Sequence, residues 1–316
     1  MVRRSGTTGI DGPTHPHSHQ HPSSARGGDW ALTESGRRFA IVTGASGGIG
    51  RATALRLSED GYDIIAHYRT RQEAAETLRE QITAKGGICW LVRADLARES
   101  DIRTLVDEVT EIVSSRRDRA LSVLVNNAAL LLGPSFAEAS LDDFDSYFAV
   151  NTRAPFFLTQ ALAPLMHAGG SIVNISSAGA HFSSPGDIVY AMSKAAVESF
   201  TKNAAQALAE HGIRINAVVP GFTENGHPAF NNTDVRAYMG SHSVLGDVSA
   251  PETVAEAVAF LASNRANRTT GTILDVSGGS TLGARLRTGS SLSLRKMQDA
   301  SLHTPTSPNS NAPVPR

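Results

Sequence analysis

Short apolar runs alternate with longer amphipathic segments along most of the chain. The runs are short enough to be buried β-strands, and they lie at residues 39–42, 64–68, 88–92, 121–125, 171–175, 213–219 and 272–276. The segments between most of them repeat their apolar positions with the period of an α-helix, at residues 51–58, 72–85, 100–114, 141–149, 153–167, 189–211 and 254–262. The chain therefore alternates between predicted strands and predicted helices.

This alternation is typical of an α/β domain built on one doubly wound, Rossmann-type parallel sheet with helices on both faces. We expect a single domain of this kind over residues 38–283. Right-handed crossovers place the functional loops at the carboxyl ends of the strands, so the chemistry should follow directly after the apolar runs.

Both ends of the chain differ from this pattern. Residues 1–37 are rich in Gly, Ser, Pro, Thr and His, and residues 284–316 in Ser, Thr, Pro, Asn and Arg. Such segments bury too little apolar surface to fold, and we expect a disordered arm and a disordered tail. Alternating histidines in the arm could bind a transition metal loosely, but nothing nearby would orient them, which favours a solvated segment. These are His15, His17, His19 and His21.

Composition narrows the class of protein. With 316 residues, 41% of them hydrophobic, and a net charge of -1, the chain can bury a core and gives no reason to expect nucleic acid as a partner. The single cysteine, Cys89, excludes an intrachain disulfide framework and gives too few thiolates for structural zinc, so we expect no metal and a cytoplasmic location. No run approaches the roughly 18 apolar residues of a membrane span, and no signal peptide is expected.

The first loop after a predicted strand is rich in glycine. It reads Thr43-Gly44-Ala45-Ser46-Gly47-Gly48-Ile49-Gly50 and precedes the helix predicted at 51–58. Small residues permit a tight turn, and the helix N-terminus directs amide donors at a pyrophosphate. Glycine is common in turns, but the position between strand and helix indicates a dinucleotide site. The expected contacts are Gly44, Ser46, Gly48, Ile49 and Gly50.

Tyr190 and Lys194 are four residues apart in the helix predicted at 189–211, so they share one face. An ammonium beside a phenol favours the phenolate, and we expect the pKa of Tyr190 to fall from its usual value of about 10. Such a phenol can give a proton to a carbonyl oxygen or take one from an alcohol. Alone the pair is weak evidence, because a lysine at this spacing can simply extend its ammonium into water.

Taken together, these segments resemble the classical short-chain dehydrogenase/reductase family over roughly residues 38–282. The loop at 43–50 is similar to the family's Thr-Gly-x-x-x-Gly-x-Gly loop. Further matches, in chain order, are Asp95-Leu96, Asn126-Asn127-Ala128-Ala129, Asn151, Ser177 thirteen residues before Tyr190, Pro220-Gly221 with Thr223, and Val276-Ser277-Gly278-Gly279. Two positions depart from the family pattern: Ala129 replaces a glycine, and Ser277 replaces an aspartate.

The resemblance implies hydride exchange between a nicotinamide and a carbonyl or secondary alcohol. Tyr190 would be the general acid/base, and Ser177 would hold the reacting oxygen. Lys194 would bind the nicotinamide ribose, and Asn151 would anchor a water that links Lys194 to solvent. Ser177 could instead satisfy turn backbone at a strand end, but its spacing to Tyr190 favours catalysis. Implied cofactor contacts also include Asp95, Leu96, Asn127, Pro220, Gly221 and Thr223.

The end of the second predicted strand bears on the choice of cofactor. An acidic residue there would bind the free ribose hydroxyls, whereas an arginine would accept a 2′-phosphate. This chain has Tyr68 and Arg69 at that point, with Arg71 close behind, and Asp63 lies at the opposite end of the strand. NADP(H) is therefore favoured over NAD(H). The alternative is that both arginines are solvated charges at a helix start.

We therefore predict an NADP(H)-dependent oxidoreductase acting on a small-molecule carbonyl or alcohol. The alternatives are a 3-oxoacyl thioester reductase and a nucleotide-sensing protein without turnover. Apolar residues suggest an uncharged substrate, and residues 223–247 a mobile lid. Apolar helix surface within 144–166 favours a homo-oligomer, a tetramer or a dimer. The residues expected on the substrate side are Leu130, Leu131, Leu132, His181, Phe182 and Phe222.

Overall fold

The computed structural model describes residues 38–116, 120–226 and 228–282. The arm at 1–37, with its histidines, and the tail at 284–316 lie outside the described residues. Within them, the strands form one seven-stranded parallel sheet in the order β3-β2-β1-β4-β5-β6-β7. The predicted doubly wound sheet is confirmed, with its order reversing between β1 and β4.

Every predicted strand is present. The bounds are β1 Arg38–Val42, β2 Tyr62–Tyr68, β3 Cys89–Arg93, β4 Leu121–Asn126, β5 Met166–Ile175, β6 Arg214–Pro220 and β7 Ile273–Val276. Strand β5 begins at Met166, although the apolar pattern predicted a helix as far as residue 167. The helix ends earlier because Pro164 interrupts it and because Gly169 adopts a left-handed φ of 95°.

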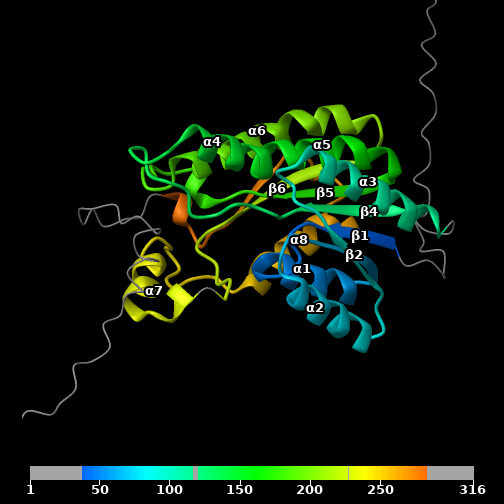
Figure 1. Ribbon diagram of the computed structural model, residues 1–316, viewed down its shortest axis with the longest axis horizontal. Coiled ribbons are helices and arrows are strands. Elements are labelled where there is room, and N and C mark those ends of the chain that lie inside the picture. Colours follow the sequence, from blue (N-terminus) through cyan, green and yellow to red (C-terminus); the bar gives the residue numbers. More distant parts are fainter. Residues whose placement is uncertain (1–37, 117–119, 227, 283–316) are drawn as a thin grey trace, which may run out of the picture. The chain divides into compact units, whose positions relative to one another are not determined.

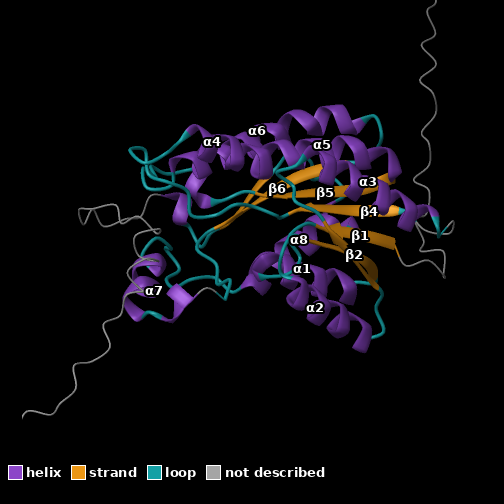
Figure 2. Cartoon of the chain, in the orientation of Figure 1, coloured by secondary structure: helices purple, strands orange, loops and turns teal. Residues whose placement is uncertain are grey.

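Helices cover both faces of the sheet (Figures 1 and 2). One face carries α1 Gly48–Glu59, α2 Gln72–Ala84 and α8 Pro251–Ala262. The other carries α3 Glu99–Ser114, α4 Leu141–Phe148, α5 Ala154–Leu162 and α6 Ile188–Ala209. The short helix α7 Thr233–Gly240 lies apart from both layers in Figure 1, within the segment predicted as a lid. No helix in the described ranges is both long and apolar enough to span a membrane.

Two apolar cores, one on each side of the sheet, hold these layers together. Alternate residues of one strand point to opposite cores, so that Val42 packs on the α1 side and Ile41 on the α3 side. Both side chains are fully buried. Burial of each such residue contributes about 1.5–3 kcal/mol, and this rigid sheet fixes the positions of the loops at its carboxyl edge.

Helices α4 and α5 are joined without a break by a π-helix, Ala149–Arg153. The sequence predicted two separate helices here, and the structure replaces the gap with a wider turn in which the Ala154 N–H reaches the Ala149 carbonyl. Asn151 lies in this turn and is buried. Turns of this kind are frequent at functional sites because they redirect backbone groups.

A buried amide network ties β4 and β5 to the helices behind them. Asn126 and Asn174 are register partners, and Asn126 Nδ2 donates to Asn174 Oδ1 at 2.8 Å. Asn174 Nδ2 donates in turn to Thr201 Oγ1 of α6 at 2.9 Å. These two strands end in the loops that carry Asn127 and Ser177, so the network helps to set the distance between those loops.

We expect Asn174→Ala to lower the free energy of unfolding by about 1–3 kcal/mol, because it leaves the buried amide of Asn126 without its main partner. Urea denaturation followed by circular dichroism measures the loss. Asn203→Ala is the matched control, since Asn203 is exposed on α6 and should change stability by less than about 0.5 kcal/mol. Equal losses in the two variants would contradict a special role for the network.

Candidate active site

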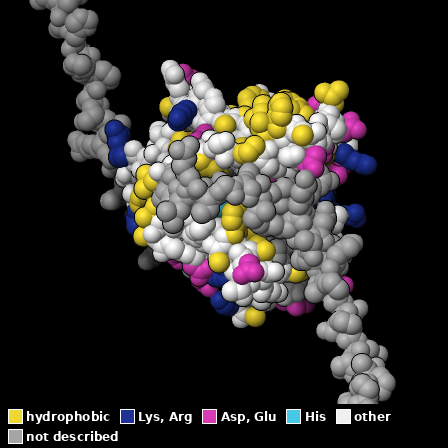
Figure 3. Space-filling model, turned by 90° about the vertical axis from the view of Figure 1, so that its left-hand side faces the viewer, with side chains coloured by type: hydrophobic (Ala, Val, Ile, Leu, Met, Phe, Trp, Pro, Cys, Tyr) yellow, Lys and Arg dark blue, Asp and Glu magenta, His cyan; other side chains and the backbone are white. Residues whose placement is uncertain are grey.

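A cavity of about 790 Å³ opens at the carboxyl edge of the sheet. It is lined by the glycine-rich loop after β1, by the loops after β2, β3, β4, β5 and β6, by the start of α6 and by the lid. Figure 3 views the face of the molecule nearest α7, where hydrophobic side chains gather in several groups. The cavity lies where the sequence predicted the functional site, at the carboxyl ends of the strands.

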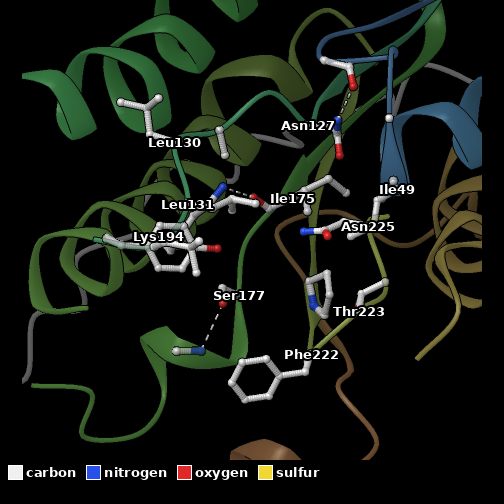
Figure 4. Close-up of a pocket in the computed structure, with 18 of the residues that line it drawn as sticks. Ile49, Asn127, Leu130, Leu131, Ile175, Ser177, Lys194, Phe222, Thr223 and Asn225 are labelled. Carbon is white, nitrogen blue, oxygen red and sulfur yellow. Dashed lines mark hydrogen bonds between the residues drawn. The ribbon is translucent and has the colours of Figure 1, made fainter. Parts of the chain in front are cut away.

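Asn127 clamps the glycine-rich loop to the end of β4. Its side-chain amide donates to the carbonyls of Thr43 at 2.8 Å and Gly44 at 3.2 Å. The Thr43 hydroxyl accepts from the backbone N–H groups of Asn127 at 2.9 Å and Ala128 at 3.0 Å. Asn127 also lines the cavity (Figure 4), and its predicted position beside the cofactor remains a prediction.

Two glycines of the loop are fixed by close packing. Gly44 has a φ of 65°, a conformation that favours glycine. A Cβ atom at Gly50 would lie 2.3 Å from the Gly44 carbonyl oxygen, which no side chain could tolerate. Gly50 thus allows the start of α1 to approach the loop, and it does not itself line the cavity. The predicted loop residues Gly44, Ser46, Gly48 and Ile49 do line it.

His67 supports the same loop and was not foreseen from the sequence. Its Nδ1 accepts a hydrogen bond from the Gly44 N–H at 3.1 Å, and its Nε2 lies 3.1 Å from the Ala94 carbonyl oxygen. Burial lowers the pKa of His67 to about 4, so the ring is neutral at physiological pH and can accept the Gly44 proton. The one sign of this role in the sequence is that His67 is a polar residue inside the apolar run at 64–68.

The loop after β2 brings basic side chains to one end of the cavity. Arg69 and Arg71 both line it, together with Asp95 and Leu96 from the loop after β3. Tyr68, a predicted cofactor contact, does not line it, whereas the preceding residue His67 does, because successive side chains of a strand point to opposite faces of the sheet. Arg71 is the closer arginine to the glycine-rich loop: a Cβ atom at Gly47 would lie 3.0 Å from its Nη1.

Ser177, Tyr190 and Lys194 meet at the other end of the cavity, as predicted. Ser177 follows β5, and its hydroxyl accepts from the Gly179 N–H at 3.2 Å (Figure 4). Tyr190 and Lys194 share the first turns of α6, with Lys194 Nζ 5.9 Å from the centre of the Tyr190 ring. The Lys194 ammonium donates to the Ile175 carbonyl at 2.7 Å.

The expected fall in the pKa of Tyr190 is wrong for this structure. Burial raises it to about 12, although the Ser177 hydroxyl acts in the opposite direction. Burial also lowers the pKa of Lys194 to about 8. The ammonium lies against a backbone carbonyl and not on the phenol oxygen, so desolvation outweighs its attraction for a phenolate.

Asn151 makes a different set of contacts from the predicted one. Its Oδ1 accepts from the Leu130 N–H at 2.8 Å, and its Nδ2 donates to the Leu130 carbonyl at 3.1 Å and to Ser193 Oγ at 3.0 Å. Asn151 does not line the cavity. Its side chain holds the loop after β4 against α6, and the predicted water relay to Lys194 remains a prediction.

Aromatic side chains surround the far side of the cavity. The centre of the His242 ring lies 5.1 Å from that of Phe222 and 4.9 Å from that of Tyr238. The ring of Phe182 is 6.0 Å from the same histidine ring, centre to centre. The predicted lining by Leu130, Leu131, Leu132, Phe182 and Phe222 is confirmed.

His181 does not line the cavity, contrary to the prediction. Its Nε2 lies 2.8 Å from Glu198 Oε1, and that carboxylate also accepts from Ser176 Oγ at 2.6 Å. The histidine is therefore directed toward α6, where it supports the loop that carries Ser177. The sequence alone could not show whether the His181 side chain points toward α6 or into the cavity.

The predicted lid extends over the cavity from β6. Backbone hydrogen bonds join Ser249 to Phe222 at 2.8 Å and to Glu224 at 2.9 Å, so the two ends of the segment are tied together. Asn225 lies across from the glycine-rich loop (Figure 4), and a Cβ atom at Gly48 would be 3.3 Å from the Cβ of Asn225. Thr223, Pro220 and Gly221 line the cavity as expected.

Proteins of known function are similar in sequence to this protein over most of its length. A family model described as enoyl-(acyl carrier protein) reductase matches residues 44–281. The 3-oxoacyl-[acyl-carrier-protein] reductase FabG of Staphylococcus aureus is 34% identical over 244 residues, which cover 77% of this chain and 97% of the relative. A (3R)-3-hydroxyacyl-CoA dehydrogenase of Canis lupus familiaris is 36% identical over 250 residues, covering 76% and 95%.

Solved structures share the fold at similar identity. The angucycline C-6 ketoreductase LanV, with bound NADP, has a TM-score of 0.75 and 38% identity, covering 78% of this chain and 96% of its own. The reductase LugOII, described as catalysing keto-reduction at C1 during lugdunomycin biosynthesis, has a TM-score of 0.75 and 36% identity, covering 77% and 98%. With the cavity geometry, these similarities establish that the chain belongs to the short-chain dehydrogenase/reductase family, oxidoreductases that act on carbonyl and hydroxyl groups with NAD(P).

Proposed function

We propose that this protein is an NADP(H)-dependent ketoreductase in which Tyr190 protonates the carbonyl oxygen of the substrate. The observation that carries the proposal is the meeting of Ser177, Tyr190 and Lys194 in one cavity with the glycine-rich loop. A sensing protein without turnover has no need for this set of groups. The position of the loop supports dinucleotide binding, because it joins β1 to the N-terminus of α1, where backbone N–H groups can face a pyrophosphate, and because Gly44, Ser46 and Gly48 line the cavity.

The chemistry of reduction suits the observed pKa directions. When bound, NADPH supplies a hydride to the carbonyl carbon. Because the pKa of Tyr190 is raised to about 12, its phenol keeps its proton at neutral pH and can deliver it to the growing negative charge on the oxygen. Ser177 donates a hydrogen bond to the same oxygen. Lys194, whose ammonium donates to the Ile175 carbonyl, would bind the ribose of the nicotinamide.

The substrate we propose is a cyclic, largely aromatic ketone. Phe182, Phe222, Tyr238 and His242 offer ring faces and edges that suit a flat apolar ligand. The similarity to LanV, whose structure is also known with NADP and rabelomycin, and to LugOII supports this class. The second candidate is a 3-oxoacyl thioester, supported by the similarity to FabG. NADPH oxidation with cyclic aromatic ketones and with 3-oxoacyl thioesters tests one against the other.

We expect Tyr190→Phe to bind NADPH normally and to lose about 100- to 10,000-fold in kcat, because only the proton donor is removed. Steady-state kinetics and fluorescence titration of NADPH measure the two effects. Tyr62→Phe is the matched control, since Tyr62 is a buried tyrosine at the opposite end of the sheet and should leave kcat unchanged. Turnover near the wild-type level in Tyr190→Phe would contradict the assigned proton donor.

The preference for NADP(H) is proposed to depend on Arg71 together with Arg69. Arg71→Ala should weaken NADPH binding by about tenfold or more and leave NADH binding much less affected, because an arginine pairs with the 2′-phosphate through charged hydrogen bonds. Arg69→Asp should do the same and add repulsion. The kcat/KM ratio for the two cofactors, at low and high salt, is the measurement.

Arg103→Ala is the control for surface charge, since Arg103 is exposed on α3 and pairs with Glu99. An unchanged cofactor ratio in both loop variants would place the phosphate-binding group elsewhere. A wild-type enzyme that prefers NADH would contradict the proposed preference for NADP(H).

We further propose that the chain forms a homotetramer in which α4 and α5 contribute to the interface between subunits. Phe156 and Phe157 are 43% and 46% exposed, and Phe144 of α4 is 38% exposed, although large aromatic residues favour burial. Light scattering should give about four times the chain mass of 33.3 kDa. Phe157→Asp should lower that mass, whereas Phe136→Ser, at an exposed loop position, should not. A monomeric wild type would contradict the proposal.

A further inference from the structure

Asp187 is a carboxylate in the cavity that the proposed reaction does not use. It immediately precedes α6, three residues before Tyr190. Its backbone is fully engaged: its N–H donates to the Ser184 carbonyl at 3.0 Å, and its own carbonyl accepts from the Ala191 N–H at 2.9 Å. The side chain does not cap the helix, and its Oδ1 is buried without a hydrogen-bond partner in the described structure.

A buried carboxylate oxygen without a hydrogen-bond partner is costly for the fold. Burial raises the pKa of Asp187 to about 6, so the group is still ionised at neutral pH although its Oδ1 has no such partner. Its negative charge also raises the pKa of Tyr190. Buried polar atoms without a partner in a native structure commonly meet a ligand or a water.

The position of Asp187 points to the substrate as that ligand. Asp187 lines the cavity beside the loop after β4, where a Cβ atom at Gly133 would lie 3.6 Å from the Asp187 Cα and 3.2 Å from the Tyr190 Cβ. The same loop therefore packs against Asp187 and the candidate proton donor. Since Asp187 and Tyr190 are three residues apart and both line the cavity, we expect one bound molecule to reach both side chains.

The surroundings favour a neutral donor on that molecule. The cationic side chains that line the cavity are Arg69 and Arg71, at the cofactor end, and Lys194, which donates to Ile175. Apolar side chains, Phe182 and Leu131 among them, also line the cavity, and they would penalise a charged ligand. A hydroxyl group on an aromatic ring meets both conditions, because it is neutral and a strong hydrogen-bond donor.

We propose that Asp187 forms a subsite that accepts a hydrogen bond from a hydroxyl group of the substrate and so selects hydroxylated cyclic ketones. The inference rests on the proposed ketoreductase function and adds to it a determinant of specificity. A charged acceptor gives one of the stronger hydrogen bonds in proteins, and a site that loses its substrate donor is left with an unpaired buried group.

The test compares 1-tetralone with its four ring-hydroxylated isomers, each reduced with NADPH at pH 7.5. We expect kcat/KM for at least one isomer to exceed that of the parent ketone by about tenfold or more. Asp187→Leu should bring this ratio close to one, and Asp187→Asn should give an intermediate ratio because its amide oxygen is a neutral acceptor. Glu252→Gln, at an exposed position on α8, is the control and should keep the wild-type ratio.

The outcomes separate the subsite from the proposed function. If the wild type reduces the parent and all hydroxylated ketones equally well, or if the Asp187 variants keep the wild-type ratio, the subsite is wrong and the ketoreductase stands. If none of these ketones is reduced but 3-oxoacyl thioesters are, both the proposed substrate class and the proposed subsite are wrong.

Stability against pH gives a second readout that does not depend on turnover. The pKa of Asp187 in the fold, about 6, is above its ordinary value of 3.8, so its ionisation destabilises the fold as the pH rises through this range. Asp187→Asn should therefore raise Tm by a few degrees at pH 7–8, with a gain that shrinks toward pH 4. The nearby Tyr190 and Lys194, with pKa values of about 12 and about 8, do not titrate between pH 4 and 7.

A lower Tm for Asp187→Asn across this range would overturn the inference, since it would mean that the carboxylate already has a stabilising partner within the protein. The measurement also shows whether both Asp187 variants fold, which makes their kinetic ratios interpretable.

Discussion

The clamp between Asn127 and the glycine-rich loop is the constraint on which the rest of the site depends. The order of the parallel sheet reverses between β1 and β4, so the chain opens a crevice at this point. The Asn127 amide and the Thr43 hydroxyl close the back of the crevice with short hydrogen bonds. His67 holds the same loop from β2. The loop that we propose to bind the dinucleotide is thereby held in place against the rigid sheet.

Desolvation governs the electrostatics at the other end of the crevice. The start of α6 and the residue before it bring a carboxyl group, a phenol and an ammonium into a largely buried region, at Asp187, Tyr190 and Lys194. In each case burial favours the neutral form, which raises the pKa of the two acids and lowers that of the lysine. This environment keeps the phenol protonated, as a group that gives a proton to a ketone oxygen must be.

The substrate compartment is assembled from segments far apart in the chain. Phe182 follows β5, Phe222 follows β6, and His242 comes from the end of the lid, yet the centre of the His242 ring lies 6.0 Å from that of Phe182 and 5.1 Å from that of Phe222. The lid is tied at its base by Ser249, which pairs with Phe222 and Glu224. The segment predicted as a lid therefore contributes to the shape of the cavity, because His242 packs against Phe222.

Some parts of this architecture follow from the sequence alone. Strand and helix periodicity is local, so the alternation of elements and the sheet were predictable, as was the shared helix face of Tyr190 and Lys194. The glycine-rich loop was recognisable because its turn needs small residues wherever the chain lies. Even the misplaced start of β5 has a local cause, since Pro164 and Gly169 interrupt the helical pattern.

Only the tertiary structure decided which side chains face the cavity and what surrounds them. Neighbouring residues of a strand or loop point in different directions, and packing against other elements selects among them. Thus His67 lines the cavity and Tyr68 does not, while His181 turns away to Glu198. The pKa of Tyr190 also depends on burial by distant segments, which opposes the effect expected from Lys194 alone. Periodicity is short-range, whereas desolvation and side-chain direction are properties of the packed molecule.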